Sequence, residues 1–395
     1  MPLMLSQPAR ITILITDRNL NVVGDPVAGW TNLDVTVRFN EPASGSFTAP
    51  ARPELTQLLQ TGGHRVVVQR AGEVFIAGPI EVQGPERWSV DGEDATPGTV
   101  SVQFADDLAS VVGRLTYPDP SAVASAQTSV ARWTSTGNAE DILRSLVNLN
   151  AGPGALADRR VPQLALGADM GVGSSITFGT RFEQLGDALR SAASAGGGLG
   201  FRTRQSGGQI LFEVYGPQDL TGQVRFSRGL GNLRSYEFTR TAPSATAAIV
   251  GGKDEGTSRV IVERVDTAAA AVWGRLETFV DRRQSDDTEV DTAELDQAGD
   301  EALARGAATA RLSSVTVDTP DQAFGVHYQL GDRVSVELNS GVEVADVVRA
   351  VHLQVTPGAG EVVTALVGSQ EASSDPLWLR YMRDLARRLA GLETI

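Results

Sequence analysis

The sequence contains no cysteine among its 395 residues, which excludes disulfides, thiolate metal sites and cysteine nucleophiles. Lys253 is its single lysine, and its three histidines, His64, His327 and His352, lie far apart without metal-ligand spacing. It also lacks the phosphate-loop motif GxxxxGK(S/T) and the nucleophile-elbow motif GxSxG. These absences exclude the nucleotide hydrolases, serine hydrolases and zinc enzymes that depend on such motifs, and we predict no cofactor and no catalytic residue.

Long apolar runs are missing as well. No stretch approaches the roughly 20 residues that a membrane-spanning helix needs, and the start MPLMLSQPARITILI lacks the basic region and cleavage site of a signal peptide. We therefore expect synthesis in the cytoplasm and no stable membrane anchoring. The formal net charge of −14 excludes a broad basic surface, so we also expect no sequence-specific nucleic acid binding.

The composition is that of an ordinary folded protein, with 41% hydrophobic and 21% charged residues. Since single cores rarely extend past about 250–300 residues, the chain should divide into several domains. Residues 1–116 show β-branched and alternating segments at 11–16 and 33–39, then the pattern of a hairpin, with residues 65–70 and 74–80 joined by the tight connection Ala71-Gly72-Glu73. This pattern predicts a small N-terminal β-barrel.

The period changes to a helical one in residues 117–220. A helix is predicted after Asn138, with apolar residues at 142, 143, 146, 147 and 149, and a second helix over 181–195, with Phe182, Leu185 and Leu189 on one face. Two strands follow, at 199–204 and 209–215. This region is predicted to be an α+β domain.

Strand patterns return in residues 221–372, which predict a second β-barrel-like domain interrupted by one helix near 292–310. The expected strands cover residues 233–240, 246–251, 258–265, 333–338, 343–355 and 361–367. The predicted fold class is thus mainly β (α+β), with two small β-barrel domains, an inserted α+β domain and a C-terminal helix.

The last segment, residues 373–395, has the pattern of an amphipathic helix that starts at Asp375 and Pro376. Its apolar residues recur at heptad spacing: Trp378, Met382, Leu385, Leu389 and Leu392. Two heptads are too short for a stable isolated helix, so this stripe must be buried. The pattern leaves two alternatives open, an interface between subunits and docking on the chain's own domain.

Acidic pairs are the remaining candidates for chemistry, because two carboxylates can act as acid and base in glycoside cleavage. They are Asp106-Asp107, Glu140-Asp141 and Asp286-Asp287. Neighbouring residues rarely face each other, and such residues are more often helix-start or solvated charges. The tryptophans are spread along the chain, which suits cores and interfaces better than a sugar-binding platform.

Three stretches carry a resemblance to a known group of proteins. They are residues 226–236 (FSRGLGNLRSY), 247–252 (AAIVGG) and 328–336 (YQLGDRVSV), the last followed by a strand pair that ends in Ala365-Leu366-Val367-Gly368. Together with the order of segments, they resemble the tail hub proteins of long-tailed (siphovirus) phages, especially the minor tail proteins of actinobacterial phages and prophages.

This resemblance implies a virion protein at the tail tip, a homotrimeric baseplate-hub-like subunit with a tail-tube-like N-terminal domain. It further implies a ring that joins the tail tube to the tip and lets DNA pass during ejection and host adsorption. The expected partners are other copies of the chain, the distal tail protein and tail tube, the tape measure protein, and other tail-tip or receptor-binding proteins. Two alternatives stay open: a cell-wall glycan hydrolase and a carbohydrate-binding receptor-recognition protein.

Overall fold

The structure is a computed structural model that describes residues 11–87, 98–252, 256–282, 292–356 and 360–368. Its internal contacts divide the chain into two compact units. The first unit consists of the described residues within 1–236 and 314–375, and the second unit of those within 237–313. The chain enters the second unit along strand β13 and leaves it along strand β17.

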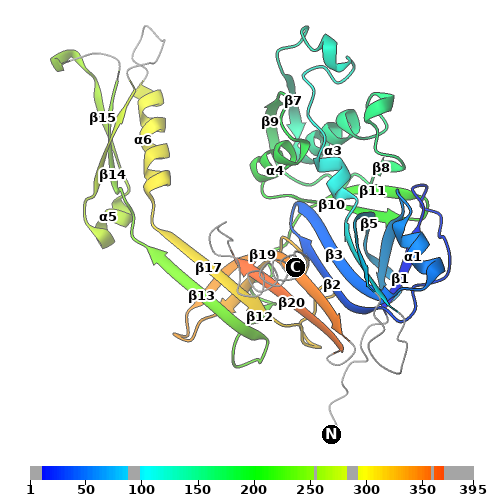
Figure 1. Ribbon diagram of the computed structural model, residues 1–395. Helices are drawn as coiled ribbons and strands as arrows, with labels where there is room; N and C mark the ends of the chain where they lie inside the picture. Colours follow the sequence, from blue (N-terminus) through cyan, green and yellow to red (C-terminus); the bar gives the residue numbers. More distant parts are fainter. Residues whose placement is uncertain (1–10, 88–97, 253–255, 283–291, 357–359, 369–395) are drawn as a thin grey trace, which may run out of the picture. The chain divides into compact units, whose positions relative to one another are not determined.

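A twelve-stranded sheet contains most strands of the first unit (Figure 1). Its main path runs β1-β4-β5-β6-β3-β2-β19-β20-β17-β13, while β18 pairs with β19 and β12 with β18. The bounds are β1 Ile11–Thr16, β2 Thr31–Arg38, β3 Glu41–Pro50, β4 Arg65–Arg70, β5 Glu73–Arg87, β6 Thr99–Ala105, β12 Arg225–Phe226, β13 Leu233–Thr241, β17 Thr309–Thr316, β18 Arg333–Glu337, β19 Glu343–Thr356 and β20 Gly360–Gly368.

The long strand β19 connects the N-terminal and C-terminal strand regions. It pairs with β18 over Glu343 to Val347, with β2 over Ala350 to Val355, and with β20 over Val348 to Thr356. The mainly β prediction is confirmed, but the two closed barrels are not found, because the described strands follow an open path. Alternation in a sequence fixes which face each side chain takes, and not which strand becomes its neighbour.

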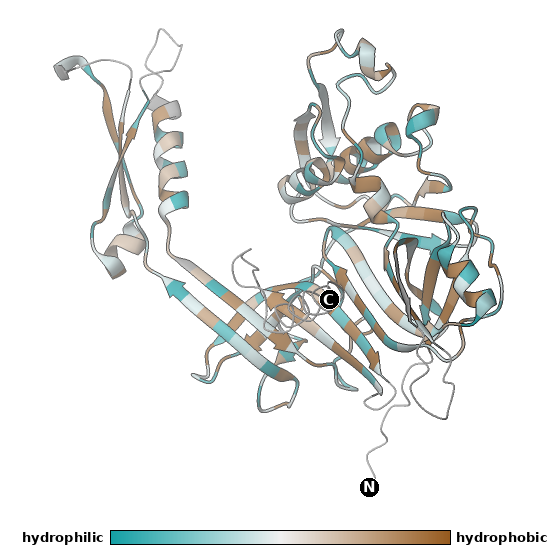
Figure 2. Cartoon of the chain, viewed as in Figure 1, coloured by the Kyte–Doolittle hydropathy of each residue, from teal (hydrophilic) through white to brown (hydrophobic). Residues whose placement is uncertain are grey.

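Local sequence explains the hairpin of β4 and β5. Ala71 and Gly72 both have positive φ, at 55° and 90°, as a two-residue turn between twisted antiparallel strands requires. Alternating hydrophilic and hydrophobic bands mark the strands of the large sheet (Figure 2). The hydrophobic bands include Phe47 and Phe104, which are 1% exposed and pack with ring centroids 6.4 Å apart.

The central part of the first unit packs helices against short strands (Figure 1). Asn138 caps α3 by accepting the N–H of Glu140, as its sequence position predicts. The apolar side chains of α3, α4 and β11 share one buried cluster. The elements here are α2 Leu108–Val112, β7 Trp133–Asn138, α3 Ala139–Asn150, β8 Leu164–Leu166, β9 Ser175–Thr180, α4 Leu185–Ala195, β10 Gly200–Ser206 and β11 Gln209–Tyr215, with short 3-10 turns at Ala124–Ala126 and Ala157–Arg159. Helix α1, Pro53–Gln60, lies instead beside the strands of the large sheet (Figure 1).

The second unit is a three-stranded sheet with one helix on it. The strand order is β15-β14-β16, with β15 antiparallel and β16 parallel to β14. Its elements are β14 Ala247–Gly251, the 3-10 turn Gly256–Ser258, β15 Ile261–Val265, α5 Thr267–Trp273, β16 Glu277–Asp281 and α6 Thr292–Gly306.

Several boundaries differ from those predicted. Phe182 was placed on the buried face of a helix, yet α4 begins at Leu185, and Phe182 has a φ of 51° and is 42% exposed. The helix expected over 292–310 ends at Gly306, and β17 follows from Thr309. Helical spacing alone could not show where alanine-rich helix gives way to strand. The two compact units have boundaries at other residues and do not test the predicted division into four domains. That division remains a prediction.

Candidate functional site

The first feature that organises the first unit is a buried ion pair. Arg65, at the start of β4, donates from Nη2 to Oδ1 and Oδ2 of Asp107 at 2.7 and 2.5 Å, and the two side chains are 5% and 7% exposed. Its Nη1 also donates to Thr16 and, at 2.9 Å, to Gln205 of β10. Burial raises the pKa of Asp107, and the charge and hydrogen bonds of Arg65 act against that rise. One guanidinium thus connects β1, β4, the start of α2 and β10.

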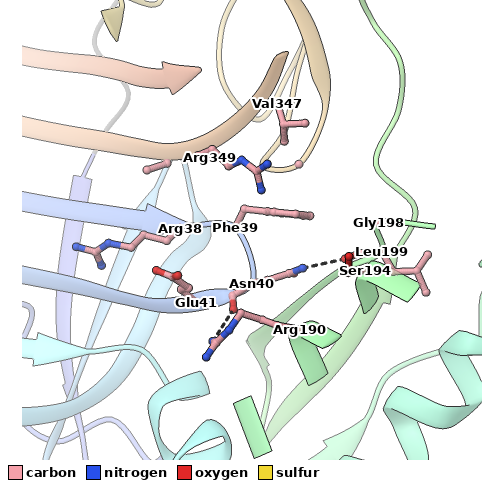
Figure 3. A pocket seen from close by; sticks show the side chains of 12 residues that line it. Arg38, Phe39, Asn40, Glu41, Arg190, Ser194, Gly198, Leu199, Val347 and Arg349 are labelled. Atoms are coloured by element: carbon pink, nitrogen blue, oxygen red, sulfur yellow. Dashed lines mark hydrogen bonds between the residues drawn. The ribbon is translucent and has the colours of Figure 1, made fainter. Parts of the chain in front are cut away.

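Asn40 forms a second joint between the β2–β3 turn and β10. It has a φ of 58°, its Nδ2 donates to the carbonyl of Leu199 at 2.9 Å, and its Oδ1 accepts the N–H of Phe201 at 2.8 Å. Figure 3 shows this side chain with the guanidinium of Arg190, which donates to the Asn40 carbonyl at 3.4 Å. An asparagine suits this position because it tolerates positive φ and offers both a donor and an acceptor.

A cavity of about 480 Å³ lies beside this joint. Arg38, Arg190 and Arg349 line it, together with Glu41. In Figure 3 the three guanidinium groups extend from different elements and do not meet at one point. Arg190 also pairs with Asp187 at 2.6 Å, and Arg38 donates to the carbonyl of Pro42. The arrangement therefore resembles a joint between elements more than a site built for one anion.

The stretch YQLGDRVSV, which carried part of the resemblance, forms a closed loop. Gly331 has a φ of 90°, and a Cβ there would lie 2.3 Å from Cε2 of Phe39, so both backbone and space require glycine. The buried carboxylate of Asp332 accepts the N–H groups of Gln218 and Gln329, each at 2.8 Å. The Gly-Asp pair therefore serves the fold.

Tyr328 stabilises the same loop through its buried side chain. It is 1% exposed, and its hydroxyl donates to Oδ1 of Asp318 at 2.6 Å. Burial raises the pKa of the Tyr328 hydroxyl well above its usual range, with a further rise from the Asp318 charge. Its ring lies edge-on to Phe226 and near Phe324.

The stretch FSRGLGNLRSY forms a turn held by one amide side chain. Oδ1 of Asn232 accepts the N–H of Ser227 at 2.9 Å, and its Nδ2 donates to the carbonyl of Arg225 and to Oε1 of Gln322. Asn232 is 2% exposed. The residue patterns of both stretches are therefore explained by the turns and hydrogen bonds that they form, and not by a catalytic role.

The second unit presents a different feature, a sheet with one covered face. The side chains of Val250, Leu295 and Ala298 form a small core between β14 and α6. Figure 1 shows α6 lying along the strands. The central strand reads Ala-Ala-Ile-Val-Gly, the continuous apolar pattern of a strand buried on both faces.

The opposite face of this sheet has no cover in the described part of the chain. Ile249 is in register with Phe279, and both point away from α6 because their neighbours Val250 and Val280 point toward it. Phe279 is 55% exposed and Ile261 is 51% exposed. We call Ile249, Ile261, Val265 and Phe279 the open face. Hydrophobic colouring along these strands is visible in Figure 2.

Charged residues surround the open face. Arg275 pairs with Glu263 and, at 2.7 Å, with Glu277. Arg259 pairs with Asp281 at 2.6 Å and lies 5.3 Å from the ring centroid of Phe279. Glu263 lies between Ile261 and Val265 on the same face, so the open face combines apolar and charged side chains, as protein interfaces commonly do.

The acidic pairs and histidines have structural partners. The carboxylate of Glu140 is fully buried and accepts the N–H groups of Met170 and Val172, each at 2.9 Å. His64 Nδ1 lies 2.7 Å from the carbonyl of Leu58, and His352 Nε2 lies 2.9 Å from Asp34. Asp286-Asp287 lies outside the described residues. Neither Asp106-Asp107 nor Glu140-Asp141 presents two unpaired carboxylates.

A search of the described residues finds no group of three or more histidine, aspartate or glutamate side chains that could hold a metal ion. No helix in the described ranges is long and apolar enough to cross a membrane. The predicted interface residues lie outside the described ranges: Trp378, Met382, Leu385, Leu389 and Leu392.

Comparison with known proteins adds to this geometry. A family model described as Siphovirus ReqiPepy6 Gp37-like protein matches residues 12–369. The chain belongs to this family. The resemblance to siphovirus tail proteins seen in the sequence is therefore confirmed. A search of curated proteins gives no match for this Gp37-like chain.

Two solved structures share the fold of this Gp37-like chain. The 43 kDa tail protein of prophage MuSo2 from Shewanella oneidensis has a TM-score of 0.52 at 12% identity, covering 91% of this chain and 98% of that protein. A tail protein from Neisseria meningitidis MC58 has a TM-score of 0.50 at 16% identity, covering 91% and 97%. At these identities the likeness establishes the fold.

Proposed function

We propose that this chain is a structural, non-enzymatic subunit of a phage tail tip, where copies of it form a homotrimeric hub that joins the tail tube to the tip. Membership of a siphovirus family and the shared fold of two tail proteins support this role. The observation that carries the proposal is the open face, because Ile261 and Phe279 beside β14 are 51% and 55% exposed and no described residues cover this side of the sheet.

We further infer that the hub surrounds a channel through which DNA leaves the particle. The formal net charge of −14 favours this role, because an acidic wall repels phosphate, whereas a basic wall would retain it. The expected neighbours are the distal tail protein, the tail tube and the tape measure protein, with other tail-tip proteins beyond.

The proposal is tested by measuring the mass of the purified chain in solution by light scattering. The wild-type chain should give a trimer, and Phe279→Asp and Ile261→Asp should shift the mass toward the monomer, because each places a charge in a buried interface. Val342→Asp is the matched control, since Val342 is 54% exposed on the β18–β19 connection of the first unit and is not part of the open face.

A wild-type chain that stays monomeric, alone and with its neighbouring tail proteins, would overturn the proposal. A trimer unaffected by both open-face variants would keep the hub and reject the open face as its interface. Incubation with peptidoglycan tests the enzymatic alternative, for which we expect no released sugar or peptide.

A further inference from the structure

A second cavity of the first unit, about 310 Å³ in volume, lies between β5, β10 and residues 324–330. Its size is at the lower end of ligand pockets. Much of its wall is apolar or aromatic, including Val37, Phe75, Ile76, Leu108, Phe201 and Phe324. Phe75 and Phe324 meet edge to face with centroids 6.3 Å apart. The cavity could therefore enclose the apolar stem of a ligand.

Asp106 contributes a largely covered carboxyl group to the wall of this cavity. Asp106 precedes α2, and its Oδ1 is covered by protein atoms yet has no hydrogen-bond partner. Its neighbour Asp107 already holds Arg65, the buried cation nearby. A covered carboxyl oxygen without a donor is costly, so its persistence needs an explanation. Rotation about the terminal torsion of aspartate is easy, so a donor in the cavity can reach either oxygen.

The three arginines of the cavity wall have partners inside the chain. Arg202 and Arg204 both bond to Glu213, at 3.0 and 2.8 Å. Arg38 donates to the carbonyl of Pro42 and to Ser44, and Glu41 lies beside it in the wall. The arginines are therefore held in place, and Asp106 contributes a covered carboxyl oxygen, Oδ1, that has no donor in the described chain.

We propose that this cavity receives a basic side chain, a lysine or an arginine presented by another tail protein, whose charged end pairs with Asp106. Long basic side chains combine an apolar stem with a charged tip, which matches an apolar and aromatic wall that leads to a carboxyl. A charge-assisted bond is also the strongest partner that a covered carboxylate can gain. The identity of the partner rests on the proposed function, whereas the cavity's preference for a cation does not.

The pH response follows from the same geometry. Burial raises the pKa of Asp106 to about 7, and the charge of Asp107 adds to the rise, against the backbone N–H groups of Ala43, Leu108 and Ala109. A cation in the cavity favours the ionised carboxyl, so binding releases a proton below pH 7. Affinity for a basic probe should therefore increase from about pH 6 to about pH 8.

The test uses the full chain and the blocked amino acids N-acetyl-lysine amide and N-acetyl-arginine amide as probes, with N-acetyl-norleucine amide as a neutral control. Titration calorimetry or NMR at probe concentrations of about 10 mM should detect the basic probes and not norleucine. Asp106→Asn should weaken binding of both basic probes about tenfold or more. Asp321→Asn, which removes an exposed carboxylate on a loop, should leave binding unchanged.

Folding is checked separately, because a lost site and a lost fold must not be confused. Asp106→Asn should melt at the same temperature as the wild type or higher, since an uncharged amide is easier to bury. If that variant does not fold, Phe75→Ala, which removes an aromatic wall, should weaken the basic probes several-fold.

The proposal fails if neither basic probe binds, if norleucine binds equally well, or if affinity does not rise with pH. Binding of maltose or N,N′-diacetylchitobiose without binding of the basic probes would mark a sugar site and overturn it. None of these outcomes depends on the mass of the chain in solution, so this inference and the hub proposal can fail independently.

Discussion

The first unit and the second unit use arginine in opposite ways. In the first unit, Arg65 is buried with Asp107 and connects four elements. In the second unit, Arg264 and Arg275 form ion pairs at the surface of a sheet that has one apolar face uncovered in the described residues. The first arrangement stabilises a fold from within. The second leaves the chain's apolar surface available to a partner.

The largest effect should come from breaking the buried arrangement. Arg65→Ala leaves Asp107 as an uncompensated buried charge, and loss of one partner of such a pair costs about 3–5 kcal/mol. Urea unfolding of the first unit should show this loss. The double variant Arg65→Met with Asp107→Leu should recover most of it, because an apolar pair of similar volume removes both charges. A double variant as unstable as Arg65→Ala would show that the loss comes from packing.

The next effect concerns which surface drives assembly. Leu385→Ala, in the predicted heptad stripe, should weaken the trimer by about 2–5 kcal/mol if that stripe is tightly packed between subunits. Light scattering against concentration measures this change, with Trp378→Ala and Leu389→Ala as companions. If Leu385→Ala dissociates the trimer and Phe279→Asp does not, the subunit interface lies in the C-terminal segment and not at the open face.

A glycine pair separates backbone strain from crowding in the first unit. Gly331 and Gly341 have φ values of 90° and 78°, but only at Gly331 would a Cβ meet a neighbour, the Phe39 ring. Alanine at either position should lower the free energy of unfolding through backbone strain. Gly331→Ala should lower it by about 1–3 kcal/mol more, because its Cβ overpacks the site. If the two alanine variants lose equal stability in thermal unfolding, crowding against Phe39 does not explain the glycine at position 331.

The buried carboxyl of Asp106 should make the stability of the first unit depend on pH. Its pKa is about 7 in the folded chain, against an ordinary value of 3.8, so the folded state binds the proton first as pH falls. The free energy of unfolding should therefore rise as pH decreases from 7 toward 4, by at most about 1.4 kcal/mol per pH unit. The difference curve between the wild type and Asp106→Asn isolates this contribution. A flat difference would contradict it.

The smallest effect should come from the surface pairs of the second unit. Arg275→Ala removes partners of Glu263 and Glu277, which remain solvated. We expect no measurable change in the unfolding midpoint. A clear loss of stability would mean that the surface ion pairs of Arg275 stabilise the second unit as strongly as the buried ion pair stabilises the first unit.

The sequence predicted local structure well where one residue decides it. Asn138 as a helix cap and Ala71-Gly72 as a hairpin turn both appear as expected, because side-chain capping and positive φ act within a few residues. Phe182 was misplaced because helical spacing extends past a start that carries no capping signal. The pairing of β2 with β19 could not be predicted, because alternation does not identify distant partners.

The candidate sites were less visible in the sequence. Arg65 opens the strand RVVVQR and could equally have been a surface residue, since nothing nearby in sequence marks Asp107 as its partner. A signal for the open face was present, because Ile261 and Val262 are consecutive apolar residues on opposite faces of a short strand. That pattern indicates two covered faces, of which the described chain supplies one.

The place of β19 in the large sheet affects when the protein can finish folding. Val35 pairs with Leu353, so β2 waits for a strand that leaves the ribosome roughly 300 residues later, on the order of tens of seconds at usual rates of synthesis. Until then the edge of β2 is a template for strands of other chains. A newly made copy therefore cannot complete this sheet before β19 has been synthesised, so the topology of the strands postpones the finished fold to the end of translation.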